Sequence, residues 1–380
     1  MPTRLVLEGG EPGTASSWRT ERTVSYDEAF KRELRELHAC IVEDRESRTS
    51  GRDGLRDVAL CQAIVSSMLG GGPQPRPTAL GGGVRIGLFT DGLGHLSLPD
   101  ALAWLERELP SVRDLEIGTG GYSPVPHCEL RALAGNDDER RRFVDGLESR
   151  GFRLAALNAS GNPLENAGHD TLLRGTIELA GLLEVERVVC MSGGRPELSG
   201  GGWFPGVEDE VERYWQDRVL PYWEAVSALA ARHADLRLCF ELEPGAAVYN
   251  VSTFERVAEL GSNLHINLDP SHFFWQSIDP LAVVARLGDR VGFVHGKDTV
   301  VDPARLELDG ALDRTAWRYA TVGHAHGEAW WRTFAAALHD AGYDDVVSIE
   351  YEDPLVPAEQ SIAEAARLLA EALSPAGAVA

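Results

Sequence analysis

Carboxylate and imidazole side chains recur at the ends of four short apolar segments in the C-terminal half of the sequence. Three carboxylates and one neutral histidine suit a hard divalent cation such as Mn²⁺ or Mg²⁺, with Zn²⁺ and Co²⁺ as alternatives. If the segments are neighbouring strands whose ends share one edge, the sequence predicts a metal site there. The segments read LRLCFELE (236–243), LHINLD (264–269), VGFVHG (291–296) and VVSIEYE (346–352).

The period of a β-strand leaves the choice of ligand open on two of these segments. Glu241 and Glu243 fall on one face of the first strand, and Glu350 and Glu352 fall on one face of the fourth. One member of each pair can therefore lie deeper than the other. Ordinary polar residues at strand ends are the alternative interpretation, but four such ends in register favour a metal site.

Eight apolar segments in all predict the fold that must position these side chains. Four of them precede the acidic ones, at 84–91, 113–118, 152–158 and 186–192. Amphipathic patterns separate most of the eight, as in SLPDALAWLEREL, where Ser97 is the expected N-cap. Continuously apolar strands that alternate with helices predict a (β/α)8 TIM barrel over 84–374, with chemistry at the carboxyl ends of the strands. A doubly wound open sheet is the alternative, although no GxGxxG follows the first strand.

The residues before the barrel differ from it in composition. GGGPQPRPTALGGG, at 70–83, is typical of a linker. Two helical patterns lie within 24–69, so residues 1–69 are expected to form a short helical N-terminal extension.

Charge and composition exclude several function classes. The formal net charge of −23 repels phosphate backbones and anionic lipids, so we expect no nucleic-acid or membrane partner. No apolar run reaches the ~20 residues needed to span a bilayer, and no signal peptide is recognisable, so a cytoplasmic protein is expected. The five cysteines have no zinc-site spacing and are expected to be reduced and buried.

The motifs FELEPGAAVYN, NLDPSHFFWQSIDP, VHGKDT and VSIEYEDP follow one another along the chain. In this order, with GGYSP and LNASGNPL before them, the sequence resembles the xylose isomerase-like superfamily of sugar (phosphate) isomerases and epimerases. The resemblance implies a set of four metal ligands, of which Glu241 and Glu350 also act as acid and base on opposite sides of a sugar carbon. The implied ligands are Glu241, Asp269, His295 and Glu350.

The same resemblance implies contacts to the substrate. His272, in the Asp-x-x-His motif, is expected to bind substrate oxygens. Lys297 and Asp298 are expected to line the same rim, and an ion pair between these two residues is an equal alternative. Relatives usually carry histidine where this chain has Glu243, which adds an acid beside the metal. Asn158, in LNASGNPL, is a further candidate for substrate binding.

Two loop segments contain further candidate functional residues. His127, in GGYSPVPHC, is a candidate acid or base or a contact to an aglycone, against the alternative of a solvated loop histidine. The long segment 299–329, which contains Arg318, His324 and His326, is interpreted as a lid element.

The expected chemistry is proton removal next to a carbonyl group. A divalent ion that chelates a carbonyl and a neighbouring hydroxyl acidifies the α hydrogen, which a carboxylate can remove. The sequence therefore predicts a metal-dependent isomerase or epimerase that acts on a keto-sugar or 3-oxo-glycoside, with Mn²⁺ as the favoured cofactor. Its net charge argues against a DNA endonuclease of the same barrel type, and the complete ligand set argues against a barrel without catalysis.

Elimination is the alternative fate of the same intermediate. The chain also resembles the catalytic (alpha) subunits of bacterial C-glycoside deglycosidases, which implies a lyase paired with a small β-rich partner subunit. Residues 27–72 resemble the C-terminal tail of the glucose-fructose oxidoreductase family, which oxidises sugars and so favours a 3-oxo-glycoside substrate. An oligomer is expected in either case.

Overall fold

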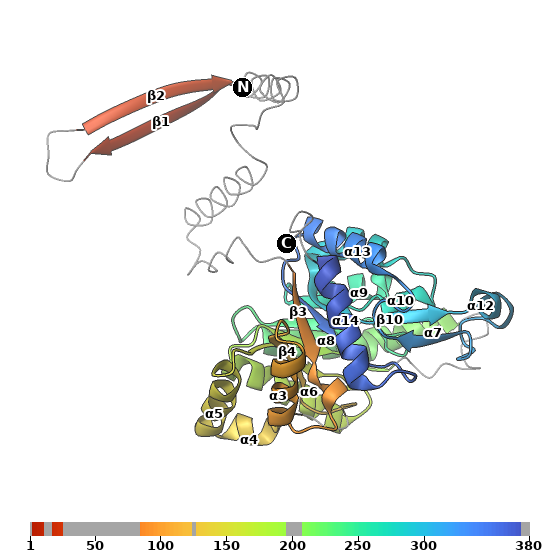
Figure 1. The fold of residues 1–380 in the computed structure, drawn as a ribbon. Helices are drawn as coiled ribbons and strands as arrows, with labels where there is room; N and C mark the ends of the chain where they lie inside the picture. The colour runs from red at the N-terminus through yellow and green to blue at the C-terminus, as the bar shows by residue number, and fades with distance from the viewer. Residues whose placement is uncertain (1, 11–16, 26–83, 124–126, 195–206, 374–380) are drawn as a thin grey trace, which may run out of the picture. The chain divides into compact units, whose positions relative to one another are not determined.

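Eight parallel strands close into a barrel in the order in which they occur along the chain. Figure 1 labels the first two of them, β3 and β4. The last strand, β12, pairs with the first, β3, so the sheet has no open edge. Helices cover the outer face and side chains fill the inside, which explains why the strands are continuously apolar. The predicted (β/α)8 barrel is confirmed. Its strands are β3 (Arg85–Phe89), β4 (Asp114–Gly118), β5 (Arg153–Ala159), β6 (Arg187–Cys190), β7 (Arg237–Glu241), β8 (Leu264–Leu268), β9 (Val291–Gly296) and β12 (Val346–Ile349).

The computed structural model describes residues 2–10, 17–25, 84–123, 127–194 and 207–373, which fall into two units divided near residue 80. In the first unit, β1 (Pro2–Gly10) and β2 (Ser17–Ser25) form an antiparallel hairpin. This corrects the expected helical extension for residues 2–25, where β-branched and aromatic residues favour strands, namely Thr3, Val6, Trp18, Thr20, Thr23 and Val24. The two helices predicted within 24–69 and the linker at 70–83 lie outside the described residues, apart from the end of β2.

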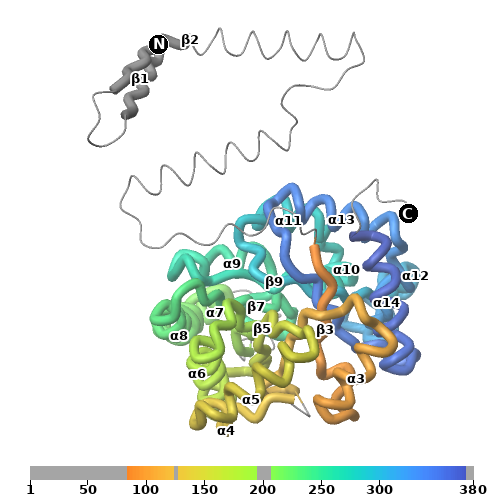
Figure 2. Tube along the Cα trace, turned by 60° about the vertical axis from the view of Figure 1, so that its left-hand side comes forward, coloured from red at the N-terminus to blue at the C-terminus, as the bar shows by residue number. Residues whose placement is uncertain are grey.

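Helices follow most barrel strands and surround them (Figure 2). Ser97 accepts a hydrogen bond from the Asp100 amide at the start of α3, as its N-cap position predicts. None of the helices that the structure describes combines the length and apolar character needed to cross a membrane. The helices are α3 (Leu98–Glu108), α4 (Leu130–Gly135), α5 (Asp137–Glu148), α6 (Ala167–Leu182), α7 (Val207–Tyr214), α8 (Leu220–Ala230), α9 (Val251–Ala258), α10 (Ser271–Phe274), α11 (Pro280–Leu287), α12 (Pro303–Asp309), α13 (Glu328–Asp340) and α14 (Ala358–Leu373). Shorter turns are the 3₁₀ helices η1 (Thr90–Leu93) and η4 (Gly288–Arg290) and the π-helix η3 (Trp215–Val219).

The segment interpreted as a lid contains regular structure instead. β10 (Asp298–Val301) and β11 (Trp317–Ala320) pair as an antiparallel ribbon, with α12 between them. The end of the segment is also anchored, because the His326 ring stacks on Phe274 with their centroids 3.8 Å apart. The His324 ring lies 3.0 Å from the Glu364 carboxylate. The ribbon therefore brings side chains to the barrel mouth as a fixed element.

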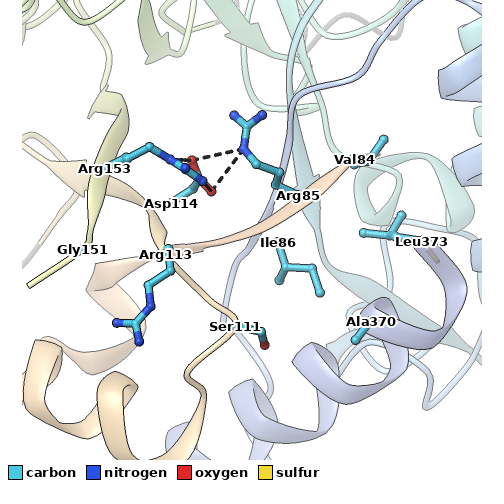
Figure 3. A pocket seen from close by; sticks show the side chains of 10 residues that line it. All are labelled: Val84, Arg85, Ile86, Ser111, Arg113, Asp114, Gly151, Arg153, Ala370 and Leu373. Carbon is cyan, nitrogen blue, oxygen red and sulfur yellow. Dashed lines mark hydrogen bonds and ion pairs between the residues drawn. The ribbon is translucent and has the colours of Figure 1, made fainter. Parts of the chain in front are cut away.

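The amino-terminal ends of the strands carry ion pairs and a pocket (Figure 3). Arg85 and Arg153 both contact the Asp114 carboxylate at the start of β4. Arg85 also pairs with Asp345 at 2.6 Å. The pocket, of about 390 Å³, lies between these strand starts and the last turn of α14. It lies at the end of the barrel opposite the acidic strand ends, so we assign its residues to stability rather than to chemistry.

Trp223 of α8 fixes the outer face of β7. Its ring lies 4.4 Å from that of Phe240, and its Nε1 atom donates to the Ser192 carbonyl at 3.0 Å. Because neighbouring side chains on a strand point to opposite faces, Phe240 directed at α8 leaves Glu241 directed into the barrel. Of the cysteines, Cys128, Cys190 and Cys239 are buried and free, as predicted, and the other two lie outside the described residues.

Replacing Trp223 with phenylalanine tests this packing. We expect Trp223→Phe to lower the free energy of unfolding by about 1–3 kcal/mol, because it leaves a cavity and an unpaired Ser192 carbonyl. Urea unfolding followed by circular dichroism measures the loss. Trp104→Phe, at a partly buried position of α3, is the control. An equal loss in both variants would contradict the role given to Trp223.

Candidate metal centre

A small apolar cluster fills the lower part of the barrel interior. Side chains two residues further along the same strands point into the same interior, nearer the carboxyl ends. On four of these five strands those next residues are polar. The apolar cluster is Ala156, Val189, Cys239, Phe293 and Val346. The polar residues above it are Asn158, Glu241, His295 and Ser348.

Four side chains at the carboxyl ends of the strands converge on one space. Glu241, Asp269, His295 and Glu350 each direct one ligand atom into it, and these four atoms lie within 4.8 Å of one another. They come from β7, β9 and the ends of β8 and β12. The donor set of three carboxylates and one imidazole fits a divalent cation. The structure thus brings together the four residues that the sequence analysis selected.

The sequence left open which glutamate of each pair belongs to the cluster. In the structure it is the deeper one, Glu241 in the first pair and Glu350 in the second. Glu241 is only 6% exposed, whereas the Glu243 carboxylate accepts a hydrogen bond from the Gly245 amide at 2.7 Å, in the loop after β7. The Glu350 side chain is 11% exposed, whereas that of Glu352 is 47% exposed. Glu243 therefore shapes a turn, and Glu352 lies at the rim.

Glu116 of β4 is a buried residue of the site that the sequence analysis missed. Its Oε2 atom lies 3.0 Å from His295 Nε2 and accepts a hydrogen bond from Ser348 Oγ at 2.8 Å. His295 Nδ1 consequently faces Glu350, at 3.0 Å. Although burial lowers it, the carboxylates of Glu116 and Glu350 hold the pKa of His295 well above its usual value. The signal in the sequence was an acid near the carboxyl end of the segment RDLEIG, in the same phase as Asp114 at its start.

Asn158 supports this arrangement from β5. Its Nδ2 atom donates to Glu116 Oε1 at 2.8 Å, and its Oδ1 atom accepts from the Ser160 amide at 2.9 Å. Both ends of the Asn158 amide are therefore used inside the protein, and the residue predicted to bind substrate holds Glu116.

His272 lies between the cluster and the β10–β11 ribbon. Its Nε2 atom is 2.9 Å from Glu241 Oε1, and its Nδ1 atom is 2.9 Å from the hydroxyl of Tyr319. Burial lowers the pKa of His272, but Asp269 and Glu241 raise it above the ordinary value overall. Tyr319, which the sequence analysis did not select, thereby fixes the orientation of the imidazole.

Lys297 is a buried cation beside the same carboxylates. Its Nζ atom lies 2.6 Å from Glu350, 2.9 Å from Glu352 and 3.0 Å from Asp269. The Tyr319 ring lies 4.5 Å from it. Burial lowers the pKa of Lys297, but the surrounding carboxylates raise it well above the ordinary value. Conversely, despite its burial, Glu350 has a pKa well below the ordinary value because of Lys297 and His295.

The described ion pairs of Lys297 are with Asp269, Glu350 and Glu352, and that of Asp298 is with His326, so the predicted alternative of an ion pair between Lys297 and Asp298 is wrong. Asp298 Oδ2 accepts hydrogen bonds from the amides of Gly323, Ala325 and His326, and Oδ1 lies 2.7 Å from His326 Nδ1. With both oxygens engaged, Asp298 organises the loop after β11 and is not available to a substrate.

His127 lies in the loop after β4. Its Nε2 atom is 3.0 Å from the Leu96 carbonyl oxygen, and its buried Nδ1 atom has no hydrogen-bond partner. Within the part of the chain that the structure describes, the metal-capable group does not include His127. Its assignment as an acid or base stays a prediction.

Changing Glu116 tests the support of His295. We expect Glu116→Gln to lower the affinity for Mn²⁺ by about 10–100-fold, because the amide orients the imidazole less firmly. Calorimetric titration of the full chain measures the affinity. Glu148→Gln, an exposed position at the end of α5, is the control and should leave it unchanged. An unchanged affinity in Glu116→Gln would refute the positioning role.

Comparison with known proteins is consistent with the geometry. Residues 116–372 match the family described as xylose isomerase-like TIM barrel. The protein YfiH of Bacillus subtilis (strain 168), described as uncharacterized, is 32% identical over 314 residues, which covers 77% of this chain and 100% of YfiH.

Two solved structures share the fold. The probable 3-DHS dehydratase AsbF of Bacillus anthracis, involved in petrobactin synthesis, has a TM-score of 0.56 and 14% identity over 76% of this chain and 99% of that chain. The IOLI protein with a bound zinc atom has a TM-score of 0.54 and 20% identity over 77% of this chain and 98% of that chain. Together with the family match over more than half of its length, these findings mean that the chain belongs to the xylose isomerase-like TIM-barrel family.

Proposed function

We propose that this protein is a divalent-metal-dependent enzyme that removes a proton α to the carbonyl of a keto-sugar or 3-oxo-glycoside, as an isomerase or epimerase. The observation that carries the proposal is the convergence of Glu241 and Glu350 on one ligand space from two strands that are not neighbours, β7 and β12. A carbon held over this space has a carboxylate available on each of two sides. Proton removal by one group and return by the other changes the configuration or the position of the carbonyl.

A divalent ion bound by Glu241, Asp269, His295 and Glu350 would polarise the carbonyl and stabilise the enediolate. The zinc atom bound by the IOLI protein, which shares the fold, supports a divalent metal in this chain. Mn²⁺ is the ion we propose, because the donors are mostly carboxylates.

The chain's own cations complete the site. Lys297 lies within 3.0 Å of Asp269 and Glu350, so its ammonium group balances the negative charge of both carboxylates beside the substrate. His272, whose Nε2 atom faces Glu241, would hold a substrate oxygen next to that carboxylate. Both side chains are almost completely buried, which strengthens their interaction with charge that develops on the substrate.

Elimination is the second candidate, because it begins with the same proton removal. Expulsion of a β-substituent from the enediolate would release an aglycone or water. AsbF, whose name describes a dehydratase, and the sequence resemblance to the catalytic subunits of C-glycoside deglycosidases support this alternative. A small β-rich partner that co-purifies with the chain would favour it.

Proton exchange in D₂O tests the proposal. The Mn²⁺-loaded full chain is incubated with O- and C-linked 3-oxo-glucosides, the protein is removed, and proton NMR is recorded. Deuterium beside the ketone, with the glycosidic bond intact, is the expected result. Glu241→Gln and Glu350→Gln should each slow the exchange by about 10²–10⁴-fold, since each removes an acid–base group. EDTA should abolish the exchange.

Other outcomes of this experiment decide between the two candidates. Free aglycone would establish elimination instead. Exchange that survives in both glutamine variants would contradict the assigned roles, and Glu148→Gln serves as the control for a change of charge far from the site. No reaction with metal bound would exclude 3-oxo-glucosides as substrates.

A further inference from the structure

The half of the barrel mouth that faces the metal-capable residues carries polar atoms without partners. β7, β8, β9 and β12 provide the four clustered residues, and β3, β4, β5 and β6 form the other half of the barrel. Among the described residues of that half, the buried oxygens without a hydrogen-bond partner include Asp91 Oδ1 after β3, Ser123 Oγ after β4 and Ser160 Oγ after β5. Buried polar atoms are nearly always paired in native proteins, so these unpaired atoms point to a ligand.

Gly118 makes the space that Asp91 and Ser123 occupy. A Cβ atom at this position would lie 2.8 Å from Asp91 Oδ1 and 2.9 Å from Ser123 Oγ. Both oxygens therefore lie against the Gly118 backbone at the carboxyl end of β4, and any larger residue would displace them. The two side chains converge on one point although they come from different loops.

The surroundings of Asp91 place it near the catalytic side of the barrel. Burial raises the pKa of Asp91 to about 6; the Ser123 hydroxyl partly offsets this effect, and the carboxylates of Glu116 and Glu350 add to it. Near neutral pH the Asp91 carboxyl group can therefore accept or donate a hydrogen bond. The neighbouring carboxylates repel anions, so an uncharged hydroxyl fits this position and a phosphate group does not.

We propose that Asp91 and Ser123 form a subsite for a hydroxyl group of a neutral sugar or polyol whose carbonyl end lies at the metal centre. The inference rests on the proposed function, because it takes the substrate to be polyhydroxylated. The metal-capable residues and this subsite lie in opposite halves of one barrel mouth, so a sugar chain between them is held at both ends. Asp91 would then select among sugars without taking part in proton transfer.

Polyol binding tests the subsite without requiring turnover. D-Glucitol is the probe, because it carries the hydroxyl groups but has no carbonyl to react. Its affinity for the full chain is measured by calorimetry, with and without Mn²⁺, and Mn²⁺ binding is titrated separately. Asp91→Ala should weaken glucitol binding at least ~10-fold, since it removes a hydrogen bond to a charged group, and Ser123→Ala should weaken it less. Both variants should bind Mn²⁺ as the wild type does.

The stability of an Asp91 variant distinguishes a binding role of this residue from a structural one. The pKa of Asp91 is raised in the folded state, so above about pH 6 its ionised form is less favourable in the folded than in the unfolded chain. Asp91→Asn should therefore be at least as stable as the wild type at pH 7.5 and still bind glucitol more weakly. Asp340→Asn, an exposed position at the end of α13, is the control for both readouts.

Two results would overturn the subsite. One is equal glucitol affinity in the wild type, Asp91→Ala and Ser123→Ala, and the other is a wild type that binds no glucitol in either metal state. Failure of the wild type to bind Mn²⁺ would instead contradict the proposed function, while the glucitol titration without metal still decides the subsite.

Discussion

Repulsion between buried carboxylates is the constraint on which the site depends. Glu116, Glu241, Asp269 and Glu350 lie together where water is largely excluded, and like charges in such a place destabilise the fold unless cations balance them. Lys297 contacts two of these carboxylates, and His295 bridges Glu116 and Glu350. A bound divalent ion would contribute the remaining positive charge. The same groups that keep the folded chain stable therefore prepare it to bind a metal.

The barrel fixes the positions of these charged side chains relative to one another. Its strands alternate inward and outward side chains, so an apolar layer at Cys239 and Phe293 is followed two residues later by Glu241 and His295. Outward residues such as Phe240 pack on the helices and fix the register. Because the sheet is closed, strands far apart in the sequence direct side chains to one mouth. The ribbon β10–β11 then adds Tyr319 from outside the barrel.

Much of this could be predicted from the sequence, because the strands are short, apolar and end in acids. The eight strands and the acidic residues at their ends follow from period and order along the chain, whereas the choice of Glu241 and Glu350 came from the resemblance to the family. Contacts between segments that are distant in the sequence could not be predicted in this way. The pairing of Glu116 with His295 joins residues 179 positions apart, and Tyr319 reaches His272 only through the folded ribbon. The role of Asp298 was predicted wrongly, because hydrogen bonds to backbone amides cannot be recognised in a sequence pattern.

Anomalous diffraction from crystals of the full chain grown with Mn²⁺ tests whether the four clustered side chains bind a metal. We expect one strong anomalous peak within coordination distance of Glu241, Asp269, His295 and Glu350, with His295 bound through Nδ1 and Nε2 still paired with Glu116. We also expect the Lys297 ammonium group to remain next to Glu352. A peak elsewhere, or no peak among these four residues under saturating Mn²⁺, would contradict the metal centre and the chemistry built on it.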